Sequence, residues 1–167
     1  MKLQVQIPNL VFRLFLRLKQ TMTLPILISL AIIVVTILIH GFGCAWGLNY
    51  LVRKVTFLKS GFNFRKSLVV LSLTAVFLML LHYVEIVLWA FVYLNIPELD
   101  KIVHWEEAIY FSTVTYTTLG YGDITLPPVW RLMSGFEAMN GILLFGWTTA
   151  MFYAVVQKIA AKIGNKN

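Results

Sequence analysis

Charged residues are scarce in this chain of 167 residues, at 13%, and only seven of them are acidic. Residues of hydrophobic type make up 59% of the sequence. A soluble domain of this size would need a larger polar surface, so the composition excludes a soluble globular protein and indicates a membrane protein. The single cysteine, Cys44, has no partner within the chain, which excludes an internal disulfide framework.

Patterns that carry catalytic chemistry are also missing. The sequence has no nucleophile–base pair, no phosphate-binding loop and no Cys–His spacing typical of a metal site, so we predict neither an enzyme nor a bound cofactor. No apolar stretch carries Arg or Lys at every third position, which argues against a voltage sensor of the gating-charge type. The net charge of +7 could indicate nucleic-acid binding, but the placement of the charges indicates a membrane topology instead.

Three apolar stretches are each long enough to cross a bilayer. They cover residues 24–51, 67–94 and 129–160, and each exceeds the roughly 20 residues that a helix needs to cross about 30 Å of hydrocarbon. We therefore predict an all-α integral membrane protein with three transmembrane helices. Residues 95–128 are too few for another span with its loops, so we expect a re-entrant element there.

Charge placement predicts the orientation of these helices. Residues 53–66 and 158–166 are rich in Lys and Arg and hold no acidic residue, so both segments are expected on the cytoplasmic side. Five of the seven acidic residues flank the loop between the second and third stretches: Glu98, Asp100, Glu106, Glu107 and Asp123. The loop should therefore lie outside, with an acidic rim that concentrates cations.

The basic residues before the first stretch do not fit the positive-inside rule. A full first span would place Lys2, Arg13, Arg17 and Lys19 outside the cell. The alternative is that residues 24–51 do not span but form a kinked interfacial element, broken near Gly41–Gly43. We favour three full spans with an external N-terminus. Residues 1–23 are then a basic segment in which 9–19 form an amphipathic helix at the membrane surface.

The most informative pattern is the heptapeptide Thr-Thr-Leu-Gly-Tyr-Gly-Asp at residues 117–123. Gly120 and Gly122 can take positive φ at little steric cost, so the backbone here can turn successive carbonyl groups toward a common axis. A ring of such carbonyls can replace the water around an alkali cation. A short aromatic-rich helix is expected immediately before it, at Trp105–Thr117.

The stretch Ala108–Pro127 resembles the pore loop of potassium channels. The whole chain is most similar to small bacterial ion channels that add one transmembrane helix before a two-helix pore domain. The resemblance implies these units: an accessory helix and basic loop (24–66), a pore domain (67–160) with outer helix (67–94), turret and pore helix (95–117), filter (118–123) and inner helix (129–160), and a short cytoplasmic tail (161–167). It also implies a homotetramer with four-fold symmetry, because one chain supplies one loop of the ring.

The same resemblance assigns residues to the filter and its support. The ion-binding set would be Thr118, Leu119, Gly120, Tyr121 and Gly122, with K⁺ at the carbonyl oxygens of the first four. The supporting set would be Tyr110, Phe111, Thr117 and Asp123, with Asp123 accepting a hydrogen bond from Tyr110. Leu119 stands where Val or Ile is usual, and loss of the β-branch is expected to loosen its packing.

The function implied is passive, potassium-selective conduction through a homotetrameric pore without a voltage-sensor domain. The expected partners are the lipid bilayer, K⁺ and three further copies of the chain, with an unidentified regulatory subunit as a further candidate and no nucleic acid. The expected location is the plasma membrane, or bacterial inner membrane, with a cytoplasmic C-terminus. Two alternatives stay open: a weakly selective monovalent cation channel, suggested by Leu119 and the acidic rim, and a non-conducting scaffold that keeps the pore fold.

Ionisable side chains within the predicted spans are functional candidates because they are costly in lipid. They are His40, His82, Glu85 and Glu137. We predict a buried His–Glu network that ties the helices together; it serves either as hydrogen bonding between helices or as a proton sensor. A metal site is not expected, because nothing in the sequence shows that these faces converge. Gly141 is a candidate hinge of the inner helix.

Overall fold

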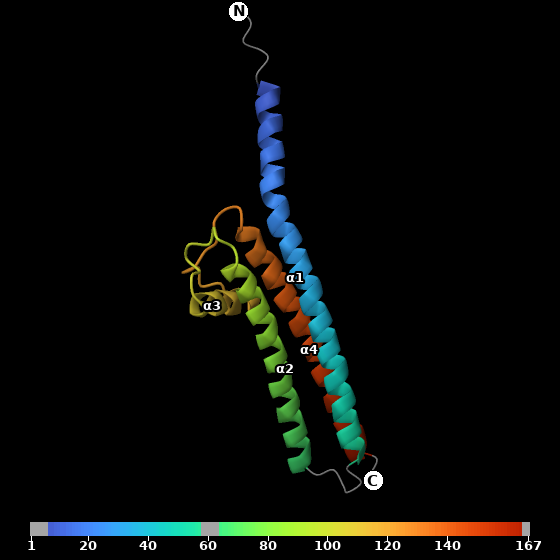
Figure 1. The fold of residues 1–167 in the computed structure, drawn as a ribbon. Helices are drawn as coiled ribbons and strands as arrows, with labels where there is room; N and C mark the ends of the chain where they lie inside the picture. The colour runs from blue at the N-terminus through green and yellow to red at the C-terminus, as the bar shows by residue number, and fades with distance from the viewer. Residues whose placement is uncertain (1–6, 58–63, 165–167) are drawn as a thin grey trace, which may run out of the picture.

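The structure is a computed structural model that describes the backbone of residues 7–57 and 64–164 and the side chains of residues 22–47, 49–50 and 64–162. Its helices are α1 (Ile7–Phe57), α2 (Phe64–Leu94), α3 (Trp105–Tyr116) and α4 (Arg131–Gly164). The three long helices run side by side, and the short α3 lies across them near one end (Figure 1). The expected all-helical fold is confirmed for the described part of the chain.

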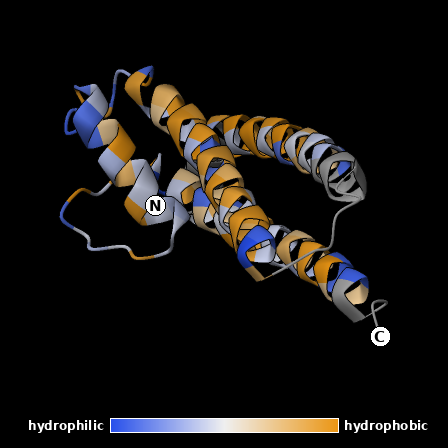
Figure 2. Cartoon of the chain, turned by 90° about the horizontal axis from the view of Figure 1, so that it is seen from below, coloured by the Kyte–Doolittle hydropathy of each residue, from blue (hydrophilic) through white to orange (hydrophobic). Residues whose placement is uncertain are grey.

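Three of the helices are long and apolar enough to cross a membrane. The candidate spans are Met22–Gly47, Phe64–Leu94 and Arg131–Lys162. Hydrophobic residues cover most of the length of these helices, and hydrophilic ones gather toward their ends (Figure 2). Large apolar side chains such as Leu38 and Met79 are two-thirds exposed, which suits a lipid environment and not water. The expectation of three apolar spans is confirmed.

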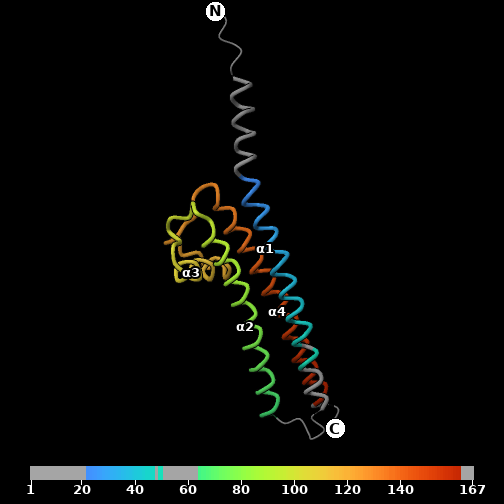
Figure 3. Tube along the Cα trace, viewed as in Figure 1, coloured from blue at the N-terminus to red at the C-terminus, as the bar shows by residue number. Residues whose placement is uncertain are grey.

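The chain runs down α1, up α2 and down α4 in the view of Figure 1. Helix α3 and the irregular segment 117–130 therefore lie at one end of the bundle, and the C-terminal part of α4 lies at the other (Figure 3). The basic residues Arg65 and Lys66 at the start of α2, and Lys162 near the end of α4, all lie at that second end.

Helix α1 packs on α2 and α4 through a narrow stripe of small and polar residues. The buried positions are Pro25, Ser29, Ile32, Thr36, His40, Cys44 and Gly47. A Cβ atom added at Gly43 would lie 2.9 Å from Leu81, and one added at Gly47 would lie 2.6 Å from Phe77. These glycines therefore permit close helix contact. Since α1 is continuous through Gly41 and Gly43, the alternative of a break at this point is wrong.

A core of aromatic and long apolar side chains holds α3 between α2 and α4. Trp89 and Tyr93 from α2, Tyr116 from α3, and Met133 and Leu144 from α4 are all fully buried. In lipid these side chains gain from close van der Waals packing and not from removal from water, so this cluster holds the short helix through its packing contacts.

Candidate functional site

The start of α3 is fixed by its own acidic residues. The backbone N–H of His104 donates to Oε2 of Glu107 at 2.7 Å. Glu106 and Glu107 both lie in the first turn, where a carboxylate complements the positive end of a helix. The buried face of this helix includes Ala108, Phe111 and Ser112. The acidic residues thus fix where α3 begins, and its buried residues fix which side of the helix faces the core.

At its other end, α3 accepts hydrogen bonds from the segment that follows it. The N–H of Thr118 donates to the carbonyl of Thr115 at 2.9 Å. The N–H groups of Leu119 and Gly120 both donate to the carbonyl of Val114, at 2.9 and 3.1 Å. Three successive N–H groups thus point back at the last turn of the helix, and they satisfy carbonyls that a helix end leaves without partners.

These bonds fix where the carbonyls of the same peptide units point. The described peptide bonds are all trans, and a trans peptide places its N–H and C=O on opposite sides. Since the N–H groups of residues 118–120 face α3, the carbonyls of Thr117, Thr118 and Leu119 face away from it. Three successive carbonyls therefore share one direction, which an ordinary extended strand does not allow.

The backbone of this segment alternates in the sign of φ. Thr118, Gly120 and Gly122 have φ of 60°, 55° and 80°, while the residues between them have negative φ. The sequence predicted this for the two glycines but not for Thr118, because a β-branched residue rarely takes positive φ. Such a conformation costs on the order of 1–3 kcal/mol, and the three bonds to the end of α3 hold it in place.

Tyr110 and Asp123 are joined at the end of this segment. The Tyr110 hydroxyl donates to Oδ2 of Asp123 at 2.6 Å. This bond lowers the pKa of the Asp123 carboxyl and raises the pKa of the Tyr110 hydroxyl. Both groups are solvent-accessible, so the bond orders the segment more than it stabilises the fold.

The other proposed filter-support residues differ in their surroundings. Phe111 is buried against the core, in edge contact with Tyr93 at a centroid distance of 5.1 Å. The Thr117 hydroxyl donates to the carbonyl of Thr113 at 2.7 Å, and so stays with the helix. The side chains of Leu119 and Tyr121 are 56% and 67% exposed in the single chain.

Behind α3, Glu137 receives two hydrogen bonds. Ser112 on α3 donates to Oε1 at 2.5 Å, and Tyr93 on α2 donates to Oε2 at 2.7 Å. The carboxyl group is fully buried, and it joins α2, α3 and α4 at one point. Sequence reasoning singled out Glu137 but missed both partners, because their positions depend on how the helices are rotated about their axes.

The other three ionisable residues meet at a second point. Nδ1 of His40 lies 2.7 Å from Oε1 of Glu85, and Nδ1 of His82 lies 3.1 Å from Oε2 of the same carboxyl group. The Tyr116 hydroxyl donates to Oε2 at 2.6 Å. The structure thus brings together three of the four predicted network residues, while Glu137 bonds elsewhere. The sequence alone did not show whether these faces converge, and the structure places ligand-type atoms of His40, His82 and Glu85 within 4.8 Å of one another.

Gly141 lies where α4 crosses the end of α3. A Cβ atom built at this position would lie 2.0 Å from the carbonyl oxygen of Tyr116, so only glycine fits without a shift of backbone. The structure therefore gives Gly141 a packing role, whereas its role as a hinge remains a prediction. By contrast, a Cβ atom at Gly146 would have no described neighbour within 4 Å.

A groove of about 640 Å³ opens between α3, the segment 118–126 and the first turns of α4. Its walls include Val114, Thr115, Gly120, Asp123 and Ser134. The groove lies directly beside the irregular segment whose carbonyls face away from α3. It has room for part of a second protein surface.

Comparison with known protein families agrees with this geometry. A family model described as an ion channel matches residues 69–158, which is more than half of the chain and includes α3 and nearly all of α2. The chain belongs to this pore-loop ion-channel family. The resemblance predicted from residues 108–127 is thereby confirmed, and a channel family implies a transport role in a membrane instead of catalysis. No curated protein and no solved structure matches the chain, and α1 lies outside the matched region.

Replacement of Gly141 by Ala should destabilise the protein by about 1–3 kcal/mol, because the new methyl group overlaps a backbone oxygen of α3 that cannot rotate away. The matched control is Gly146→Ala on the same helix, which meets open space in the described chain. Thermal unfolding in detergent, followed by circular dichroism, measures the difference. Equal stability of the two variants would show that the close contact is not tight and would leave the hinge as the better role.

Replacement of Tyr110 by Phe should raise the pKa of Asp123. The hydroxyl holds that pKa below its ordinary value, so the wild-type carboxylate stays ionised to a lower pH than it will in the variant. Carboxyl ¹³C NMR of aspartate-labelled protein can follow this, because the sequence holds only Asp100 and Asp123. Tyr83→Phe on α2 is the control, and a Tyr110→Phe titration that overlays it would refute the assigned cause.

Proposed function

We propose that four copies of the chain form a pore that conducts K⁺ selectively and passively. The observation that carries this proposal is the backbone after α3, where the carbonyls of Thr117, Thr118 and Leu119 face away from the helix that binds their N–H partners. Carbonyl groups held in one direction can replace the hydration shell of a cation when several chains surround it. We assign the ion-binding positions to Thr118, Leu119, Gly120 and Tyr121, with Gly122 completing the strand.

The homotetramer follows from what a single chain leaves incomplete. One chain supplies one row of carbonyls, and a closed ring needs copies related by cyclic symmetry. Leu119 and Tyr121 are more than half exposed in the single chain, beside the groove that α3 and the segment 118–126 line. Neighbouring copies that cover these residues would complete the filter and hold its width, with Tyr110, Phe111, Thr117 and Asp123 as support.

The orientation in the membrane follows from charge. Arg65, Lys66 and Lys162 mark the end of the bundle away from α3, and we place this end in the cytoplasm of a bacterial cell. The α3 end and the N-terminal part of α1 then lie outside. Residues 67–160 form the pore domain, and residues 24–66 form the accessory helix with its cytoplasmic loop.

Gating by voltage through charged helix positions is not part of the proposal. The apolar windows of the three spans hold few charged residues. The buried carboxyl groups hydrogen-bond to side chains of neighbouring helices and do not form a row of charges along one helix that voltage could move. The stimulus is therefore expected to act through the membrane, through protons or through a regulatory subunit.

A weakly selective cation channel is the second candidate, and Leu119 is the residue that favours it. Its side chain is 56% exposed in the subunit and lacks the β-branch that stiffens Val or Ile, so it supports the strand less firmly. Replacement of Leu119 by Val should raise the K⁺/Na⁺ permeability ratio, measured from reversal potentials in planar bilayers. A ratio unchanged by Leu119→Val would remove the side chain as a determinant of selectivity.

The proposed function is tested by flux and mass together. Purified protein in proteoliposomes should take up K⁺ in a Ba²⁺-sensitive manner and have the mass of a tetramer by light scattering. Gly120→Ala should reduce this flux at least about tenfold, since an L side chain at φ of 55° is strained by roughly 1–2 kcal/mol. Gly146→Ala serves as the control. Tetramers that pass no K⁺ would favour the scaffold alternative, and monomers would refute the pore.

A further inference from the structure

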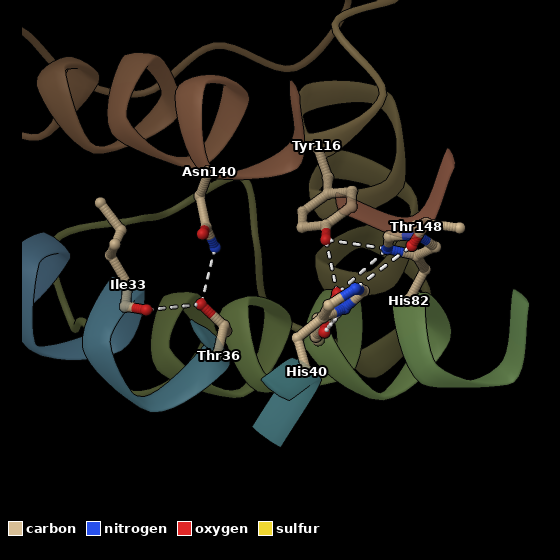
Figure 4. Close-up of polar contacts among 8 residues, drawn as sticks. Ile33, Thr36, His40, His82, Tyr116, Asn140 and Thr148 are labelled. Carbon is tan, nitrogen blue, oxygen red and sulfur yellow. Dashed lines mark hydrogen bonds and ion pairs between the residues drawn. The ribbon is translucent and has the colours of Figure 1, made fainter. Parts of the chain in front are cut away.

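The buried cluster around Glu85 forms a closed ring of hydrogen-bonding groups from three helices. Glu85 contacts Nδ1 of both His40 and His82, as described above. On the far side, Nε2 of His82 lies 2.8 Å from the Thr148 hydroxyl, and Nε2 of His40 lies 3.2 Å from the same oxygen. Thr148 therefore closes a ring that runs from α1 through α2 to α4 (Figure 4).

Protein alone satisfies the polar atoms of this ring. The side chains of His40 and Glu85 are fully buried and His82 is 4% exposed. The aromatic rings of Phe145 and Trp147 pack against His82 and His40, at centroid distances of 4.6 and 5.5 Å. In such surroundings an unpaired polar atom is costly, so each contact in the ring should be a true donor–acceptor pair.

The four contacts of the ring need four hydrogens, whereas two neutral histidines and the Thr148 hydroxyl supply three. The Tyr116 hydroxyl lies 3.1 Å from Nδ1 of His82 but only 2.6 Å from Oε2 of Glu85, so its hydrogen goes to the carboxylate. When both Nδ1 atoms donate to Glu85, each neutral imidazole is left with a bare Nε2. The Thr148 hydroxyl has one hydrogen and can donate to only one of these two nitrogens. The other contact is then a lone pair facing a lone pair, unless a further proton sits in the ring.

One added proton completes every contact, wherever it resides. As an imidazolium, His40 or His82 donates from both nitrogens, and Thr148 accepts from one ring and donates to the other. Alternatively, Glu85 carries the proton and donates to Nδ1 of His40, which then donates from Nε2 to Thr148. Both arrangements hold the same number of hydrogens and have no net charge, so they are two forms of one occupied state.

Net charge favours a proton over a metal ion as the occupant. A divalent transition metal bound to two neutral histidines and one carboxylate would leave a positive charge in a fully buried site. The ring with one added proton is neutral, and burial of an uncompensated charge is strongly unfavourable.

We propose that His40, Glu85, His82 and Thr148 form a binding site for a single proton, and that its occupancy ties the accessory helix α1 to the inner helix α4. Loss of the proton leaves two acceptor nitrogens facing one hydroxyl, so the contact of α4 with α1 and α2 weakens. The consequence for conduction rests on the proposed channel function, whereas the proton site itself does not.

The other titratable groups around the ring are few. Cys44 lies one turn beyond His40 on α1, Tyr116 on α3 donates to Glu85, and Glu137 on α4 is bonded to Tyr93 and Ser112 instead of the ring. Among these three groups, Tyr116 is therefore the one that contacts the ring directly, at Glu85 and at Nδ1 of His82.

Histidine ¹⁵N NMR of the protein in lipid bilayers tests the site directly. The background is His104→Gln, because His104 is the third and last histidine of the sequence. Between about pH 5 and 9, the ring should lose one proton in a single step that changes the ¹⁵N signals of both remaining imidazoles together, through loss of an imidazolium proton or through a change of tautomer. Two independent steps, or no change at all over this range, would overturn the proposal.

Variants of Thr148 distinguish the loss of the ring's shared hydroxyl from a general change in packing. Thr148→Val keeps the shape but removes the shared hydroxyl, and should move the shared step to lower pH by about one unit or more, a tenfold loss of proton affinity. Thr148→Ser restores the hydroxyl and should titrate as wild type. Thr149→Val is the matched control, since the Thr149 hydroxyl bonds only to the carbonyl of Phe145 on its own helix. Equal titrations of Thr148→Val and Thr149→Val would refute the ring.

Two further outcomes are decisive. Addition of Zn²⁺ that abolishes the proton step and shifts both imidazole signals at micromolar concentration would show a metal site and overturn the proton assignment. Potassium flux measured on the same samples keeps the two proposals distinct. A single shared proton step in protein that conducts no K⁺ would refute the channel alone, and normal flux without the step would refute the proton site alone.

Discussion

The irregular segment after α3 depends on two backbone carbonyls, those of Val114 and Thr115. They accept the N–H groups of residues 118–120 and thereby turn the partner carbonyls outward. The segment has no regular ladder of its own to satisfy its backbone groups, so the neighbouring helix must supply their partners. The direction of the outward carbonyls therefore depends on the position of the last turn of α3. Much of the remaining structure holds that helix in place.

Two different contacts hold α3 against α4. Gly141 lets the α4 backbone touch the carbonyl of Tyr116, and Glu137, one turn earlier, bonds to Ser112. The first contact sets the distance between the helices, and the second sets the rotation of α3 about its axis. Together they make the position of the carbonyl row depend on α4.

Sequence reasoning predicted the features that depend on local pattern. Length and hydropathy predicted the apolar spans, and the motif at 117–123 predicted the family and the positive φ of both glycines. It also anticipated the bond between Tyr110 and Asp123, because the resemblance placed them together. It did not predict positive φ at Thr118, since threonine disfavours it and only the hydrogen bonds to α3 compensate. Nor could it identify Thr148 as the link between His40 and His82. Thr148 is 108 residues from His40 and 66 residues from His82 in the sequence.

Helix α1 is bound to α2 and α4 by its polar residues more than by its apolar ones. The Thr36 hydroxyl accepts from the Asn140 amide at 2.8 Å, and His40 lies in the ring with Glu85 and Thr148 one turn further on (Figure 4). Lipid surrounds apolar side chains as well as protein does, so these polar pairs fix the rotation of α1. Both pairs reach α4 on the same side of α1. Although α1 lies outside the region that matches the channel family, its removal would take His40 from Glu85 and Thr148 and would leave the buried Asn140 amide without the Thr36 hydroxyl, so α1 is an integral part of this bundle.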